Sequence, residues 1–167
     1  MIVGTIAGIM LMTQINPTIL RECLKILEPY EIIYLGLVGS RYWKTEVESS
    51  DWDFFCIVEV DKDCFKSYKN NQLNIHLWGC RNFKNALSKS NPLAWEWLNY
   101  SQPVQGQLPD LNHLADTSLL LSRIKHNTQQ EFSNQTLSYK QSNWQKRYEG
   151  FIQQLTQQVQ YGQHQNP

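Results

Sequence analysis

The chain alternates between stretches with helical and with strand-like spacing of apolar residues. Leu20, Leu24 and Leu27 repeat at helical spacing after an Asn16-Pro17 pair, which is typical of a helix start. Three later stretches are largely apolar, rich in residues that favour strands and too short for ordinary buried helices. They read EIIYLGLV (31–38), DWDFFCIVEV (51–60) and LNIHLWG (73–79). The pattern predicts one amphipathic helix followed by three strands.

Beyond the third strand the spacing becomes helical. Two short helices are expected within residues 81–100, the second with Asn91 as its cap and Pro92 in its first turn. A final helix is marked by an apolar stripe. Its members are Trp144, Tyr148, Phe151, Ile152, Leu155 and Val159. This order of elements indicates an α/β or α+β fold, with a core in residues 1–104 and a helical C-terminal extension in residues 105–167.

Composition narrows the class of protein. The 167 residues, 41% of them hydrophobic, suffice for one domain with a well-buried core. Fifteen Lys and Arg balance fifteen Asp and Glu, so no overall charge favours binding to nucleic acid or to a membrane. The four cysteines show no CxxC or Cys/His ligand spacing, and we therefore expect a reduced, cytoplasmic protein.

The N-terminal stretch MIVGTIAGIMLM is apolar and uncharged. It has about half of the roughly 20 residues that span a bilayer, and it lacks the basic flank of a signal peptide. We therefore expect no membrane partner. Residues 1–11 either precede a start at Met12 or form an extra strand, and the sequence leaves the oligomeric state open.

Two short motifs carry candidate chemistry. Gly39-Ser40 ends the first strand, where a glycine permits a tight turn and backbone N–H groups with a hydroxyl can hold phosphate oxygens. Further on, Asp51 and Asp53 open the second strand on one face, from which both can ligate the same hard cation or bracket two Mg²⁺ ions. Alone, a Gly-Ser pair is most often a turn, and an Asp-x-Asp pair often consists of a cap and a partner for a lysine. Their order and spacing favour a joint phosphate and metal site.

The stretch GSRYWKTEVESSDWD resembles the motif of the polymerase-β-like nucleotidyltransferase superfamily, a Gly-Ser turn followed by an acidic-apolar-acidic strand. It is most similar to the predicted nucleotidyltransferases associated with RNA ligases and RNA repair. Asn91, Pro92 and Glu96 resemble that group's helix pair with a central Asn-Pro and a following glutamate. The resemblance covers about residues 31–104 and implies the superfamily's fold, a small mixed sheet flanked by helices.

The same resemblance implies an activity. Gly39 and Ser40 would bind the phosphates of a nucleotide, and Asp51 and Asp53 would be the catalytic ligands of Mg²⁺ or Mn²⁺. The implied reaction transfers a nucleoside monophosphate from an NTP to a hydroxyl of RNA or of a protein and releases pyrophosphate. Arg41 either adds a guanidinium to a phosphate or is a solvated arginine of the turn.

Two departures from the family pattern leave a second interpretation open. Lys44 stands where the family usually has a glycine, and the strand 73–79 offers no third carboxylate. Asn74 and His76 lie nearest to that third position, and His76 is either a metal ligand or base, or a hydrogen-bonded strand histidine. The two hypotheses are an active nucleotidyltransferase and a degenerate relative that binds a nucleotide or a partner protein without catalysis. The sequence identifies neither the NTP nor the acceptor.

Overall fold

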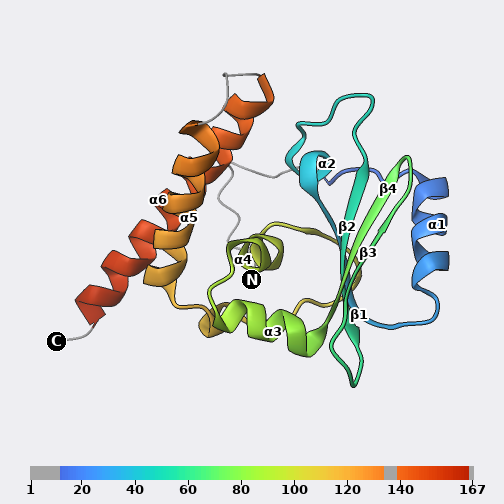
Figure 1. The fold of residues 1–167 in the computed structure, drawn as a ribbon, viewed down its shortest axis with the longest axis horizontal. Helices are drawn as coiled ribbons and strands as arrows, with labels where there is room; N and C mark the ends of the chain where they lie inside the picture. The colour runs from blue at the N-terminus through green and yellow to red at the C-terminus, as the bar shows by residue number, and fades with distance from the viewer. Residues whose placement is uncertain (1–11, 134–138, 166–167) are drawn as a thin grey trace.

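The computed structural model describes residues 12–133 and 139–165, so the predictions for residues 1–11 lie outside the described part of the chain. The described helices and strands follow one another in the order of Figure 1. They are α1 (Pro17–Leu27), β1 (Glu31–Val38), α2 (Gly39–Trp43), β2 (Trp52–Glu59), β3 (Phe65–Lys69), β4 (Leu73–Gly79), α3 (Cys80–Ser88), α4 (Pro92–Asn99), β5 (Gln102–Gly106), the 3₁₀ turn η1 (Asn112–Leu114), α5 (Thr117–Ser133) and α6 (Tyr139–Gln165).

The five strands form one mixed sheet in the order β3-β4-β2-β1-β5. β2 and β4 are parallel, and the other neighbouring strands are antiparallel. Figure 1 shows α1 on one face of the sheet, α3 and α4 on the other, and the α5–α6 pair as an outer layer beyond them. The predicted fold class is therefore confirmed: an α/β (α+β) fold with a small mixed sheet flanked by helices and a helical C-terminal extension.

Helix α1 begins as the sequence predicts. The side chain of Asn16 accepts a hydrogen bond from the backbone N–H of Thr18 at 2.9 Å. Pro17 occupies the first turn, where a backbone N–H has no acceptor within the helix, so the proline costs no hydrogen bond. The buried side chains of the helix are Ile19, Cys23 and Leu27. Burial raises the pKa of the Cys23 thiol to about 12, so this cysteine is an unreactive part of the core.

Side-chain alternation along β2 divides the interior into two clusters. Phe54 belongs to the cluster under α1, whereas Phe55 belongs to the cluster under α3 and α4. The Phe55 ring lies 4.8 Å, between centroids, from the ring of Trp97 in α4. Burying such a side chain contributes roughly 1.5–3 kcal/mol. Because Asp53 precedes Phe55 by two residues, its side chain shares the face of the sheet that α4 covers.

The C-terminal helices contribute to the core on this same face. Leu120 and Ile124 of α5, with Phe151 and Leu155 of α6, belong to the cluster under α3 and α4. Strand β5 extends across residue 104, the expected boundary between core and extension, and pairs with β1. The extension is thus packed onto the sheet through shared apolar side chains.

Three elements go beyond the prediction. Gly39–Trp43 is a short helix where a turn was expected. Phe65–Lys69 lies in a stretch expected to be a polar connection, and it forms the largely exposed edge strand β3. Gln102–Gly106 forms the opposite edge strand, β5, which contains Pro103. Edge strands tolerate polar residues and proline because one side of their backbone makes no sheet hydrogen bonds.

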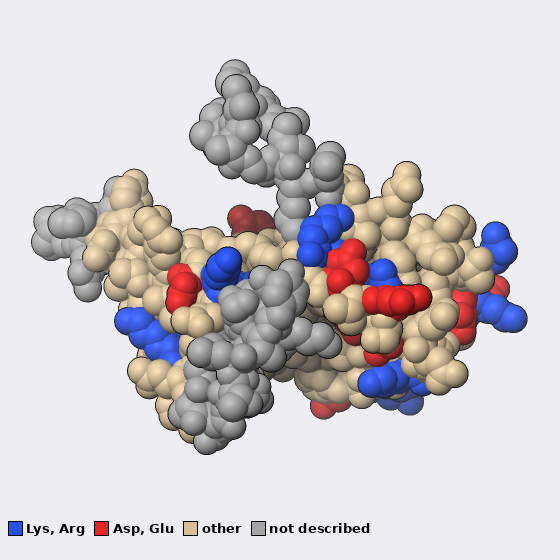
Figure 2. Space-filling model, turned by 90° about the horizontal axis from the view of Figure 1, so that it is seen from above, with Lys and Arg blue, Asp and Glu red and all other residues tan. Residues whose placement is uncertain are grey.

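The surface agrees with the balanced composition. On the face drawn in Figure 2, the described acidic and basic side chains are interspersed, without a broad patch of one sign. Among the described helices, none combines the length and the apolar character needed to cross a membrane.

Candidate active site

The expected site residues come together at one end of the sheet. β1 ends there at Val38, and β2 and β4 both begin there, because these two strands are parallel to each other and antiparallel to β1. The strand register pairs Val38 with Asp53 and Asp53 with Asn74. The Gly-Ser turn, the aspartate strand and the third position suggested by the sequence are therefore neighbours.

Gly39 lies directly against the carboxylate of Asp53. Its φ angle is +75°, a left-handed conformation that favours glycine. A Cβ added at this position would lie 2.5 Å from Oδ2 of Asp53, well inside van der Waals contact. The backbone of Ser40 follows in the first turn of α2, where its carbonyl accepts the N–H of Thr45 at 2.9 Å. The glycine is thus required both by its backbone angle and by the nearby carboxylate.

A chain of hydrogen bonds runs from Asp53 across β4. Nδ2 of Asn74 donates to Oδ1 of Asp53 at 3.0 Å and lies 3.2 Å from Nε2 of His76. Because the amide group donates to Asp53, its second N–H meets Nε2 of His76, which therefore accepts and leaves the ring proton on Nδ1. The His76 ring also packs on the ring of Trp97, with centroids 4.9 Å apart.

Burial sets the protonation of these groups. It raises the pKa of the Asp53 carboxyl above its ordinary value; the hydrogen bond from Asn74 opposes this rise, and the negative charge of Asp51 adds to it. Burial also lowers the pKa of His76, which agrees with a neutral ring that accepts from Asn74. A cation bound beside Asp53 would relieve the electrostatic cost of its buried charge.

Arg41 shapes the loop that leads to β2. Its guanidinium donates to the carbonyl of Ser50 at 2.8 Å and lies 4.1 Å from the ring centroid of Trp52. These contacts hold the loop against the start of the strand, so the side chain is more than a solvated turn arginine. Its expected contact with phosphate remains a prediction.

Lys69 is a site residue that the sequence reasoning missed. It ends β3, is paired in register with Asn74, and places its Nζ 4.0 Å from Oδ2 of Asp51. The stretch around it was expected to be a connection because exposed edge strands show no apolar alternation. A turn signal was present, since the Asn70 side chain accepts the backbone N–H groups of Gln72 and Leu73 between the two strands.

The donor atoms fit one hard cation. Asp51 and Asp53 supply two carboxylates, and Mg²⁺ is commonly held by one or two carboxylates together with substrate phosphates. Asn74 turns its amide nitrogen, and not its oxygen, towards Asp53. Within residues 12–133 and 139–165, no group of three or more His, Cys, Asp and Glu side chains is arranged to hold a metal ion. The described residues thus fit a single ion shared with phosphate and supply no separate ligands for a second.

The Asn91-Pro92 pair and Glu96, which resemble the family's second motif, stabilise helix α4 and its contact with α6. The side chain of Asn91 caps α4 by accepting the N–H groups of Leu93 and Ala94 at 3.0 and 3.1 Å. Glu96 is buried, and its Oε1 lies 3.4 Å from Nε of Arg147 in α6. Burial raises the pKa of the Glu96 carboxyl, while the Arg147 charge opposes the rise.

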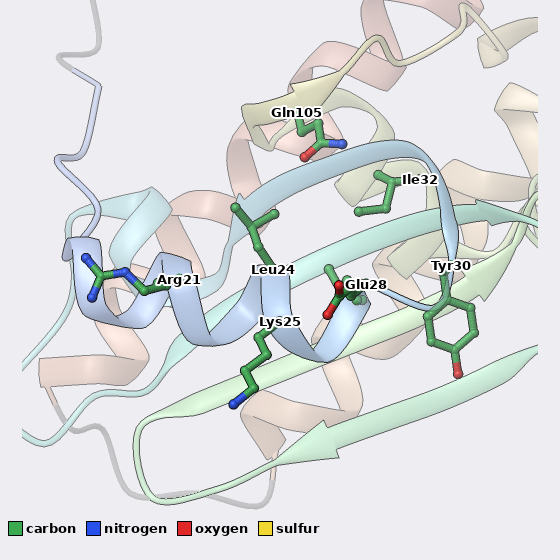
Figure 3. A pocket seen from close by; sticks show the side chains of 8 residues that line it. Arg21, Leu24, Lys25, Glu28, Tyr30, Ile32 and Gln105 are labelled. Atoms are coloured by element: carbon green, nitrogen blue, oxygen red, sulfur yellow. The ribbon is translucent and has the colours of Figure 1, made fainter.

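A groove of about 720 Å³ lies elsewhere, beside α1. Figure 3 shows its walls, to which α1 contributes Leu24 and Lys25 among others and β5 contributes Gln105. Helix α1 covers the face of the sheet opposite to that of Asp53. This groove is therefore not part of the aspartate site.

Comparisons with known proteins give a distant structural likeness. No family model matches the chain, and no curated protein matches it. Among solved structures, a nucleotidyltransferase-like protein from Exiguobacterium sibiricum is 16% identical, with a TM-score of 0.43. The match covers 70% of this chain and 46% of that protein, so it spans less than half of the protein's length. Functional conclusions for this chain therefore depend on its own site residues.

Proposed function

We propose that the protein is a Mg²⁺-dependent nucleotidyltransferase that transfers a nucleoside monophosphate from an NTP to a hydroxyl of RNA or of a protein. The observation that supports this most directly is the contact between the turn and the aspartate strand. Gly39 adopts a left-handed backbone conformation and lies so close to the Asp53 carboxylate that a side chain at this position would collide with it. A phosphate held at this turn would lie next to the carboxylates that ligate the metal ion.

Each residue has a distinct task in this proposal. Asp51 and Asp53 hold the Mg²⁺ ion, which neutralises phosphate charge when it is bound. The backbone N–H groups of the Gly39-Ser40 turn and the Ser40 hydroxyl bind the phosphates, and the missing Cβ of Gly39 lets this turn lie directly against the Asp53 carboxylate. The acceptor oxygen forms a bond to the α-phosphorus and its proton passes to solvent. The bond from that phosphorus to the bridging oxygen breaks, and its electron pair leaves with pyrophosphate. The sequence resemblance to the polymerase-β-like superfamily supports the same assignment.

One observation favours the second hypothesis, a relative that binds nucleotide without catalysis. The third position holds the neutral Asn74, whose amide donates to Asp53 and so competes with a metal ion for that carboxylate. An amide supplies less charge than a carboxylate for holding a second ion. The choice between transfer and binding alone therefore depends on whether one metal ion suffices.

The deciding experiment incubates the protein with Mg²⁺, each of the four labelled NTPs, and total cell RNA or lysate. We expect label to be transferred by the parent and lost in Asp51→Asn and Asp53→Asn, which keep side-chain size but remove the charge. Asp61→Asn is the matched control, because Asp61 is exposed beyond the opposite end of β2. Binding of Mg²⁺-NTP without transfer would support the second hypothesis, and a parent that does neither would contradict both.

A further inference from the structure

Lys69 lies in the same row of the sheet as the aspartate site. The register pairs Lys69 with Asn74 across β3 and β4, and Asn74 with Asp53 across β4 and β2. Residues paired directly across neighbouring strands point to the same face of a sheet. Lys69 therefore projects to the side on which Asn74 and Asp53 meet, although it is far from the Gly39 turn in sequence.

The ammonium group of Lys69 is held only loosely by the protein. Its Nζ is 4.0 Å from Oδ2 of Asp51, and its side chain is 68% exposed, compared with 29% for that of Asp51. An exposed ion pair at this distance contributes little to stability. Lys69 can therefore exchange Asp51 for another anion at small cost, leaving the Asp51 carboxylate to ligate a metal ion.

The other lysine of β3 is placed differently. Lys66 pairs in register with Leu77, whose side chain belongs to the cluster under α1, so Lys66 points to the opposite face. Its Nζ donates to the hydroxyl of Tyr30 at 3.1 Å. The two lysines lie three residues apart on one edge strand, and only Lys69 shares a face with the aspartates.

The charges of the site leave a triphosphate incompletely neutralised. One Mg²⁺ ion balances the two carboxylates of Asp51 and Asp53, and the neutral Asn74 supplies no charge with which to hold a second ion. The Arg41 guanidinium is already engaged by the Ser50 carbonyl and the Trp52 ring, so it can neutralise the phosphates only in part. The negative charge that builds up on the leaving pyrophosphate must still be balanced by a nearby cation. A compact ammonium on a flexible stem is suited to this.

We propose that Lys69 supplies the second cation of the site and binds the β- and γ-phosphates of the Mg²⁺-bound triphosphate in place of a second metal ion. This inference rests on the proposed function. The lysine moves from Asp51 to the phosphates as the metal ion occupies the two carboxylates. The site then carries one divalent ion and one ammonium group, and it balances the phosphate charge without the third carboxylate that would hold a second metal ion.

The test is isothermal titration calorimetry with Mg²⁺ and two kinds of probe, inorganic tripolyphosphate and each of the four NTPs. Tripolyphosphate reports on the phosphate subsite without requiring knowledge of the base. We expect Lys69→Met to weaken binding of both probes about tenfold, the equivalent of one lost charge-assisted hydrogen bond. Lys69→Arg should retain most of the affinity, and Lys66→Met should bind like the parent.

Metal stoichiometry gives a second readout that does not depend on turnover. With saturating tripolyphosphate, the parent should bind one Mn²⁺ ion, counted by electron paramagnetic resonance. Two bound ions would overturn the inference. Equal affinity of Lys69→Met and Lys66→Met, alongside lost binding in Asp53→Asn, would overturn it while leaving the proposed function intact. If the parent binds neither tripolyphosphate nor any NTP, the proposed function fails, and this inference fails with it.

Discussion

Replacing Gly39 with alanine tests the close contact on which the site assignment depends. The added Cβ would lie 2.5 Å from Oδ2 of Asp53, 3.0 Å from its Cβ and 3.1 Å from its Cγ. Rotating the carboxylate relieves the first of these contacts, but the Cβ of Asp53 is fixed by the backbone of β2. The new residue must also adopt a φ of about +75°. We therefore expect Gly39→Ala to destabilise the fold and to displace the carboxylate.

The magnitude follows from two contributions. A left-handed conformation costs a non-glycine residue roughly 1–2 kcal/mol. Forcing the Asp53 side chain away from its preferred rotamer costs roughly 0.5–1.5 kcal/mol more. Together these predict a loss of about 2–3 kcal/mol in the free energy of unfolding. In an Asp53→Ala background the rotamer contribution disappears, and the effect of Gly39→Ala should fall by about 1 kcal/mol.

Urea denaturation followed by tryptophan fluorescence measures these free energies, since the chain has six tryptophans. Gly150→Ala is the control, because Gly150 lies in α6 with nothing within 4 Å of an added Cβ. That substitution should stabilise by about 0.5–1 kcal/mol, opposite in sign to Gly39→Ala. If Gly39→Ala is as stable as the parent, or has the same effect with and without Asp53, the described contact is wrong.

Two further predictions concern a buried ion pair and a buried, neutral histidine. Arg147→Met leaves the buried Glu96 carboxylate without its ion-pair partner, so we expect the free energy of unfolding in urea to fall by about 3 kcal/mol. Lys146→Met, at the exposed neighbouring residue, should have little effect. Equal urea midpoints for the two variants would contradict the ion pair. Burial lowers the pKa of His76 in the folded protein, so as the pH falls the unfolded chain takes up a proton at this ring before the folded protein does. The free energy of unfolding should therefore decrease as the pH falls below about 6.5. In metal-free buffer, His76→Gln should therefore lose less stability between pH 7 and pH 5 than the parent, and an equal loss would show that the ring is not held neutral.

Local sequence signals predicted the central elements well. Strands β1, β2 and β4 are central in the sheet. β1 and β2 are buried largely on both faces, and β4 alternates between buried and half-buried residues, so their apolar content identifies them. The Asn16-Pro17 pair identified the start of α1, and the structure shows the expected cap. The family resemblance suggested Asn74 and His76 for the third position, and the structure pairs β2 with β4 so that Asn74 contacts Asp53.

The remaining elements depend on tertiary contacts that leave little trace in the sequence. Strand β3 lies at an edge with its side chains largely exposed, so it has no hydrophobic period, and the position of Lys69 is fixed only by pairing with β4. The contact between Gly39 and Asp53 likewise depends on the antiparallel register of β1 and β2. A sequence pattern can predict that two motifs belong to one site, but not which atoms meet there.

Trp43 explains why the C-terminal helices matter to a site formed by the sheet. It ends α2, the helix that begins with Gly39, and its ring packs 5.2 Å from that of Tyr100 and 5.8 Å from that of Phe151 in α6. The guanidinium carbon of Arg147 in α6 also lies 5.3 Å from the Trp43 ring centroid, and Arg147 pairs with Glu96 of α4. Because α2 has little more than one turn, its own hydrogen bonds cannot hold it in place. The turn beside Asp53 is therefore positioned from both sides, by the sheet at its start and by the C-terminal layer at its end.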